Sequence, residues 1–167
     1  MAYRDLLQGK DVFEVQGLVR KNGSQYISRS QIGDDDETGH IYSVLVILEP
    51  AIANPPQYME LKFFLVVANS ETGYIDELSD GRQTKPFLDS PDVRLSVLQL
   101  ICSVSCELLK VANPQRVHYV SADVNLPAKA LTKYTFLCKA LKRVGYEGRE
   151  VDKFLGNHMW LLERVDA

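Results

Sequence analysis

The sequence predicts a single α/β domain in which helices flank the faces of a mixed β-sheet. Two segments rich in β-branched and aromatic residues, 41–48 and 58–68, are typical of strands. Residues 95–109 form an apolar run typical of a buried helix. Because another strand-like segment, 116–122, follows this helix, the order predicts a parallel strand pair joined by a helical crossover. The 167 residues suit one domain, 1–167, and no linker or repeat divides them.

The segments before the first strong strand are less regular. Residues 11–20 alternate weakly between apolar and polar, which fits either a strand or a helix, and we favour a helix. Residues 21–23 are a turn signal, and 25–32 are then expected to be a short strand. Four carboxylates crowd the stretch 33–39, GDDDETG. Because like charges repel one another when packed, this stretch is expected to be a solvated loop.

An antiparallel hairpin is predicted in the middle of the chain. The strands 41–48 and 58–68 are separated by 49–57, whose three prolines interrupt regular structure. Residues 69–73 are expected to turn the chain, so that 74–78 returns as a third strand beside 58–68.

The long apolar helix has clear boundary signals. Ser90 is a good N-cap, Pro91 occupies the first helical position and Asp92 lies in the first turn. The helix is expected to run to about Val111 and to stop before Asn113 and the proline that follows it. Its apolar side chains cover almost the whole circumference, which predicts burial against the sheet.

The last third is predicted to add a strand, a helix and a closing strand. After the strand 116–122, a second long helix begins at Pro127 or Ala128. Gly145 is a natural C-cap for this helix. Residues 157–165 are expected to be the final strand.

Charge and cysteine content narrow the classes of function. The net charge is -3, so no broad basic face for nucleic acid is expected. The N-terminal residues lack the apolar core of a secretory signal, and the run 95–109 is too short to predict a membrane span. The three cysteines form no CxxC pair, which is typical of free thiols in a reducing cytoplasm. We therefore expect a cytoplasmic protein that binds neither nucleic acid nor membrane.

Three short motifs follow the long apolar helix. They are Val117-x-x-Val120, Asn125-x-x-Ala128 and Gly145-Tyr146. With the order of elements over 58–165, they resemble the end of a GNAT-family N-acetyltransferase domain. The resemblance implies a GNAT-like fold and a transfer of an acetyl group from acetyl-CoA to a small-molecule or protein amine. It places the acyl-CoA in a splay between the strands 74–78 and 116–122, where backbone N–H groups would hold the oxyanion.

The resemblance also assigns roles to particular residues. The general-acid tyrosine of the family lies four residues before the Gly-aromatic pair, and that position is Leu141 here. Because the helix before Gly145 is about two turns longer than in the family, the resemblance makes Tyr134 the expected acid for the leaving thiolate if the extra turns follow it. His118 is the expected base, which would accept the amine proton through water. Asp123 and Glu107 are alternative bases. Core packing is the competing interpretation of both Tyr134 and His118.

The cofactor site is expected at the start of the crossover helix. The family holds the pyrophosphate there with a glycine-rich loop, Gln/Arg-x-x-Gly-x-Gly/Ala, because exposed N–H groups and the helix dipole favour an anion. The matching stretch 86–94 contains no glycine. The expected cofactor-binding residues are therefore Arg82, Lys85 and Arg94, and the motif residue Asn125.

The second hypothesis is a catalytically inactive domain of the same fold that binds a protein partner as a regulatory or inhibitory module. The expected apolar contact residues are Phe87, Ile52 and Leu155. No metal site is predicted, because the acidic run 34–37 lacks the spacing of an EF-hand loop. The cysteines are expected to be small buried hydrophobic residues.

Overall fold

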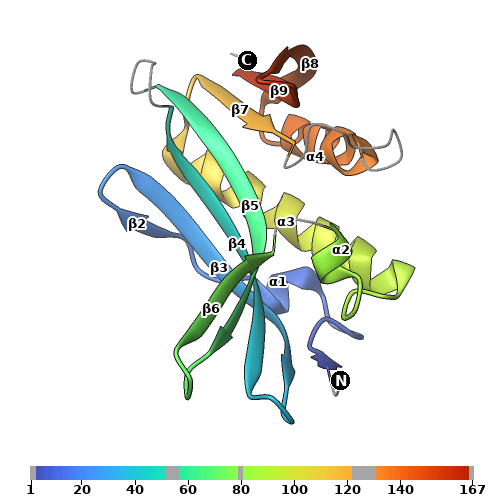
Figure 1. Cartoon of the computed structure of the whole chain (residues 1–167). Helices are drawn as coiled ribbons and strands as arrows, with labels where there is room; N and C mark the ends of the chain where they lie inside the picture. The colour runs from blue at the N-terminus through green and yellow to red at the C-terminus, as the bar shows by residue number, and fades with distance from the viewer. Residues whose placement is uncertain (1–2, 52–56, 79–80, 122–130, 166–167) are drawn as a thin grey trace.

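A computed structural model describes residues 3–51, 57–78, 81–121 and 131–165. The chain forms a mixed, mostly antiparallel nine-stranded sheet with helices packed against it (Figure 1). The expected α/β class with a mixed sheet is confirmed. The sheet is more extensive than the sequence predicted.

The strands run β1-β3-β4-β5-β7-β9-β8 across the sheet, with β2 beside β3 and β6 beside β5. Their bounds are β1 Tyr3–Asp5, β2 Arg20–Asn22, β3 Gln25–Asp35, β4 His40–Pro50, β5 Tyr58–Asn69, β6 Tyr74–Leu78, β7 Arg116–Val120, β8 Tyr146–Phe154 and β9 Asn157–Arg164. The helices are α1 Val12–Val15, α2 Gly81–Thr84, α3 Pro91–Ala112 and α4 Thr132–Lys142. The start expected for the second long helix, at 127 or 128, lies outside the described residues.

Strand β5 has two different neighbours along one edge. Its first residues, Tyr58–Glu60, pair in parallel with Arg116–His118 of β7, as the crossover predicted. Its last residues, 65–69, pair antiparallel with β6, which confirms the expected hairpin. Among the described strands, none pairs with residues 61–64 on this edge. The sheet therefore opens between β6 and β7.

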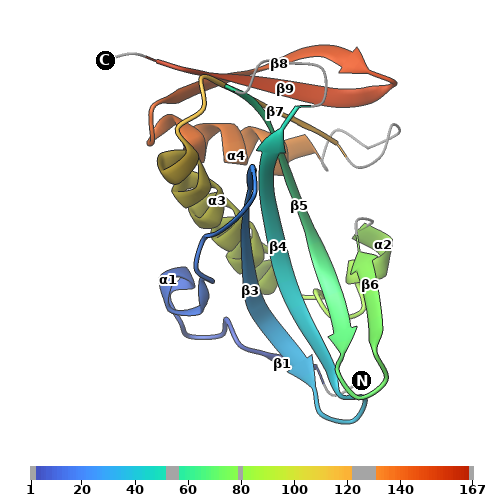
Figure 2. The same cartoon turned by 90° about the vertical axis from the view of Figure 1, so that its left-hand side faces the viewer.

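The long helix begins and ends as predicted. The Ser90 hydroxyl accepts a hydrogen bond from the backbone N–H of Asp92, and Asn113 adopts the left-handed conformation at the C-cap. Figure 2 shows α1, α3 and α4 on the same side of the sheet. The helix is not buried all round, since Leu95 is 47% exposed. Its inner face packs on β3 and β4, which fixes the start of β7 beside β5.

Helix α3 is also long and apolar enough, by length and composition, to cross a bilayer. The helix has 22 residues and is therefore longer than the apolar run 95–109, which was judged too short for a membrane span. Its buried positions belong to the hydrophobic core, and a core helix passes the same test of length and composition.

The acidic stretch expected to be a loop is partly a strand. Asp34 and Asp35 belong to β3, and β1 pairs with them, so the loop prediction for 33–39 was wrong at its start. Asp35 is 1% exposed and its carboxylate accepts the backbone N–H groups of Glu37 and Thr38. Arg4 pairs with Asp34 at 2.6 Å. Hydrogen bonds and a counter-charge thus offset the repulsion that the prediction assumed.

Two other elements differ from the prediction. The helix expected over 11–20 is limited to Val12–Val15, and Arg20 already begins β2. Strand β8 was not predicted at all, because most of its residues are exposed and charged and no apolar alternation marks it. It lies at the edge of the sheet, where such a composition prevents pairing with other chains.

Candidate functional site

The opening between β6 and β7 begins at a polar pair. Glu60 and His118 are the last residues paired in the parallel ladder between β5 and β7. They alternate along their strands with the buried Met59 and Val117, so their side chains point to the opposite face from α3 and α4. The candidate site is therefore the point where β5 and β7 separate.

His118 is half-buried beside a carboxylate. Its Nε2 atom lies 3.8 Å from Oε1 of Glu60, and its ring meets that of Tyr58 edge-on at 5.1 Å. Its Nδ1 atom is buried and has no hydrogen-bond partner among the described residues. Burial lowers the pKa of His118, and the nearby Glu60 carboxylate opposes this shift. A neutral imidazole with an unpaired nitrogen can accept a proton or a hydrogen bond.

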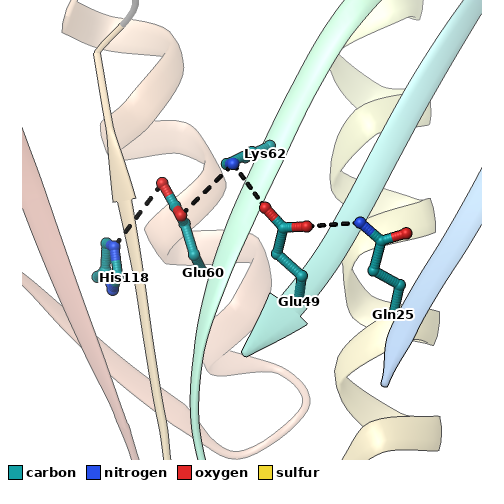
Figure 3. A network of polar contacts seen from close by, with 5 residues as sticks. All are labelled: Gln25, Glu49, Glu60, Lys62 and His118. Atoms are coloured by element: carbon teal, nitrogen blue, oxygen red, sulfur yellow. Dashed lines mark hydrogen bonds and ion pairs between the residues drawn. The ribbon is translucent and has the colours of Figure 1, made fainter. Parts of the chain in front are cut away.

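A chain of polar contacts extends from this pair across four strands (Figure 3). The ammonium of Lys62 lies 3.6 Å from Glu60 and 2.5 Å from Glu49. The side-chain amide of Gln25 donates to Glu49 at 2.6 Å. The hydrogen bond from Lys62 lowers the pKa of Glu49, and the same contact raises the pKa of Lys62. The network keeps Lys62 charged and restricts the orientations of Glu60 and Lys62.

Tyr134 lies on the other face of the sheet. It is 2% exposed and stacks on Trp160, with ring centroids 4.6 Å apart. Its backbone carbonyl accepts a hydrogen bond of 2.8 Å from Tyr119, the residue after His118 in β7. Successive residues of a strand point to opposite faces, so Tyr134 and His118 are on opposite sides of the sheet. Tyr134 also lies 6.0 Å, ring to ring, from Phe63 in the unpaired part of β5.

The expected phosphate-binding residues are only partly brought together. Lys85 and Arg94 are exposed near the start of α3, and the Arg94 guanidinium donates to the carbonyl of Leu88 at 3.3 Å. Asn125 and the side chain of Arg82 lie outside the described residues. The first turn of α3 is capped by its own Ser90, and Pro91 has no N–H to offer. This helix end is thus poorly prepared for a pyrophosphate.

The cysteines are placed as small core residues. Burial raises the pKa of Cys102 to about 12, and it also raises the pKa values of the Cys106 and Cys138 thiols. The Sγ atom of Cys138 lies 2.9 Å from the Tyr119 hydroxyl. No cluster that could hold a metal ion occurs among the residues that the structure describes.

The residues expected to contact a protein partner have mixed outcomes. Phe87 is 6% exposed and packs against Tyr42, so the prediction of an exposed side chain was wrong there. Leu155 is 83% exposed, at the tip of the β8–β9 hairpin, as expected. Ile52 lies outside the described residues. The sequence did not indicate an open apolar groove of about 460 Å³, whose lining includes Leu18 and Val111.

Comparison with known proteins adds no assignment. No protein-family model, curated protein or solved structure matches this chain. The function is therefore inferred from the geometry of the chain.

His118 predicts a pH dependence of stability. Its pKa in the folded chain is lowered below the unfolded value of about 6.5. Between these two pKa values the unfolded chain binds more protons than the folded chain. The contribution of His118 to the free energy of unfolding is therefore full above about pH 6.5 and is lost as the pH falls through the folded pKa. We expect His118→Gln to reduce the acid-side loss of stability measured by urea unfolding. His40→Gln is the control, and an equal pH profile for both variants would contradict the prediction.

Proposed function

We propose that this chain is a GNAT-like acyltransferase that moves an acetyl group from acetyl-CoA to an amine at the opening between β6 and β7. The observation that carries the proposal is the end of the parallel ladder at Glu60 and His118, next to an unpaired strand edge at 61–64. Free N–H and C=O groups on such an edge suit the amide-containing arm of CoA. The parallel pair joined by α3 and the hairpin before it support the GNAT-like fold.

The two faces of the opening would supply the two proton-transfer groups. The amine nitrogen bonds to the thioester carbonyl carbon, and the C–S bond breaks. The proton of the amine passes through water to His118, which Glu60 stabilises when charged. Tyr134, next to Phe63 on the opposite face, would protonate the leaving thiolate. The burial of Tyr134 requires that the donor reach it through the opening.

The donor would be anchored differently from the usual family pattern. The start of α3 lacks glycine, is capped by Ser90 and carries two exposed carboxylates, Asp89 and Asp92. Lys85 and Arg94 are the exposed cations nearby among the described residues. Lys85 would bind a phosphate as a point charge, and Arg94 would bind one through the N–H groups of its planar guanidinium. We therefore expect acetyl-CoA to bind more weakly in high salt.

Calorimetric titration with acetyl-CoA and CoA tests the donor site. We expect micromolar binding, followed by thiol release when a panel of amines is added. His118→Gln and Glu60→Gln are expected to lower kcat by about a hundredfold or more, and Tyr134→Phe to lower it similarly, because each removes a proton-transfer group or its charge partner. Glu77→Gln, an exposed change on β6, is the matched control. No binding at millimolar ligand would overturn the proposal.

A specific observation favours the second hypothesis, a protein-binding module. Three of the exposed large hydrophobic residues, Phe13, Leu18 and Val111, line the open groove of about 460 Å³. Grouped apolar exposure of this kind is typical of protein contact sites. Capture of a partner that Leu18→Ser abolishes, together with absent CoA binding, would favour this function over acyl transfer.

A further inference from the structure

A free strand edge lies beside the apolar groove. Val19 lines the groove, and the next residue, Arg20, begins strand β2. This strand lies at the outside of the sheet (Figure 1), and among the described strands it pairs only with β3. Because an antiparallel ladder alternates, part of the N–H and C=O groups of β2 point away from β3. The chain thus offers backbone hydrogen bonds to another strand directly beside an apolar groove.

The edge carries two cations without counter-charges. Arg20 and Lys21 are exposed, and neither has a carboxylate within ion-pair distance among the described residues. The ammonium of Lys21 lies 5.5 Å from the centroid of the Tyr26 ring, which packs against the core. Glu107, the carboxylate in the groove lining, is already paired with Lys110 at 2.7 Å. The uncompensated charge on β2 is therefore positive.

The two cations lie on different faces of the sheet. Lys21 pairs with Tyr26, and Tyr26 pairs with the buried Leu48, so Lys21 is on the helix-bearing face. The groove is on that face too, since α3 contributes part of its lining. Arg20 is on the opposite face, because successive residues of a strand alternate. A strand added to β2 would therefore meet Val19, Arg20 and Lys21 with side chains of both its faces.

A second copy of this chain does not suit the edge. Pairing of β2 with itself would bring Arg20 and Lys21 against the same two cations of the other copy. Like charges that lie opposite one another destabilise an antiparallel pair. A strand with carboxylates at these positions gains electrostatic attraction instead, so charge complementarity favours an acidic partner.

We propose that β2 and the groove bind an extended segment of a partner protein that carries two acidic residues next to an apolar one. The acidic residues lie opposite Lys21 and Arg20, and the apolar side chain lies opposite Val19 and enters the groove beside Leu18. The backbone of the segment pairs with the free edge of β2. The partner so defined rests on the second hypothesis, in which the groove is a protein contact site, and acyl transfer is not involved.

Selection of peptides is the first measurement, with the full chain as bait and a phage-displayed library of random decapeptides. We expect the selected peptides to share an apolar residue next to two acidic ones. Leu18→Ser is expected to weaken their binding about tenfold or more, while Ile75→Ser, a similarly exposed change on β6, leaves it unchanged. If no selected peptide depended on Leu18, the second hypothesis itself would fail. Selected peptides rich in lysine or arginine would overturn the acidic partner alone.

Charge reversal and hydrogen exchange are the second measurement, made with the selected peptides. Lys21→Glu is expected to weaken binding about tenfold, because repulsion replaces attraction, while Lys153→Glu, an exposed change in β8 at the far end of the sheet, does not. Bound peptide is also expected to slow the amide exchange of residues 19–22. Equal affinity in the two lysine variants, or unchanged exchange in β2, would overturn the proposal and leave the groove as a contact site of another kind.

Discussion

Replacing Trp160 by alanine is expected to lower the free energy of unfolding by about 3–5 kcal/mol. Trp160 is 3% exposed and stacks on Tyr119 at 5.4 Å as well as on Tyr134. Removing the indole would leave a cavity between β9 and α4 that these rings cannot fill, because their own positions are fixed by neighbouring contacts such as the Tyr119 hydrogen bond. Urea unfolding measures the loss.

The control for this substitution is on the same hairpin. Phe154 is 57% exposed at its tip, and Phe154→Ala is expected to change the free energy of unfolding by no more than about 0.5 kcal/mol. Equal effects of the two substitutions would show that the aromatic cluster does not contribute to the core as described.

The second large effect is expected from Gly17→Ala. A methyl group at Gly17 would lie 1.9 Å from the backbone oxygen of Arg29, a contact that the strand cannot relieve by moving a side chain. The backbone of Gly17 also forms hydrogen bonds with the hydroxyls of Ser30 and Ser28, at 2.8 and 2.9 Å. We expect a loss of about 2–4 kcal/mol in the free energy of unfolding, measured by urea titration, because the segment must leave β3.

Two neighbouring substitutions calibrate that result. Leu18→Ala removes a side chain that is 81% exposed, so we expect little change in stability. Ser30→Ala leaves the N–H of the half-buried Gly17 without its partner and is expected to cost about 1–2 kcal/mol. If Gly17→Ala behaved like Leu18→Ala, the close approach of Gly17 to β3 would be wrong.

The elements that the sequence predicts well are those with strong local signals. The long helix has an N-cap at Ser90 and a proline at its first position, and both act within its first turn. Its apolar face adds a signal that repeats along the helix. Strands β4 and β5 have continuous β-branched character. Strand β8 has neither signal, because an edge strand is determined by its pairing with β9 rather than by its own composition. Asp35 was misjudged because its carboxylate is satisfied by backbone groups that only the folded turn provides.

The candidate site was predictable only in part. His118 was selected from its place in a strand, but its neighbour Glu60 lies 58 residues earlier, and only the parallel pairing of β5 and β7 brings them together. The free edge of β2 was not predicted, since residues 11–20 were expected to be a helix. Tyr134 and His118 were expected at one site, and strand alternation places them on opposite faces of the sheet.

The short ladder between β5 and β7 has a consequence for cooperativity. The sheet has two parts, one formed by β1 to β6 and the other by β7, β9 and β8. Among the described strands, the ladder that joins the two parts has three residue pairs, all between β5 and β7. Side-chain packing through α3 and α4 must therefore hold the two parts together. A ladder this short can open without disturbing the registers on either side, so backbone amides of β7 to β9 are expected to exchange with solvent as one group, at a lower free energy than those of β4.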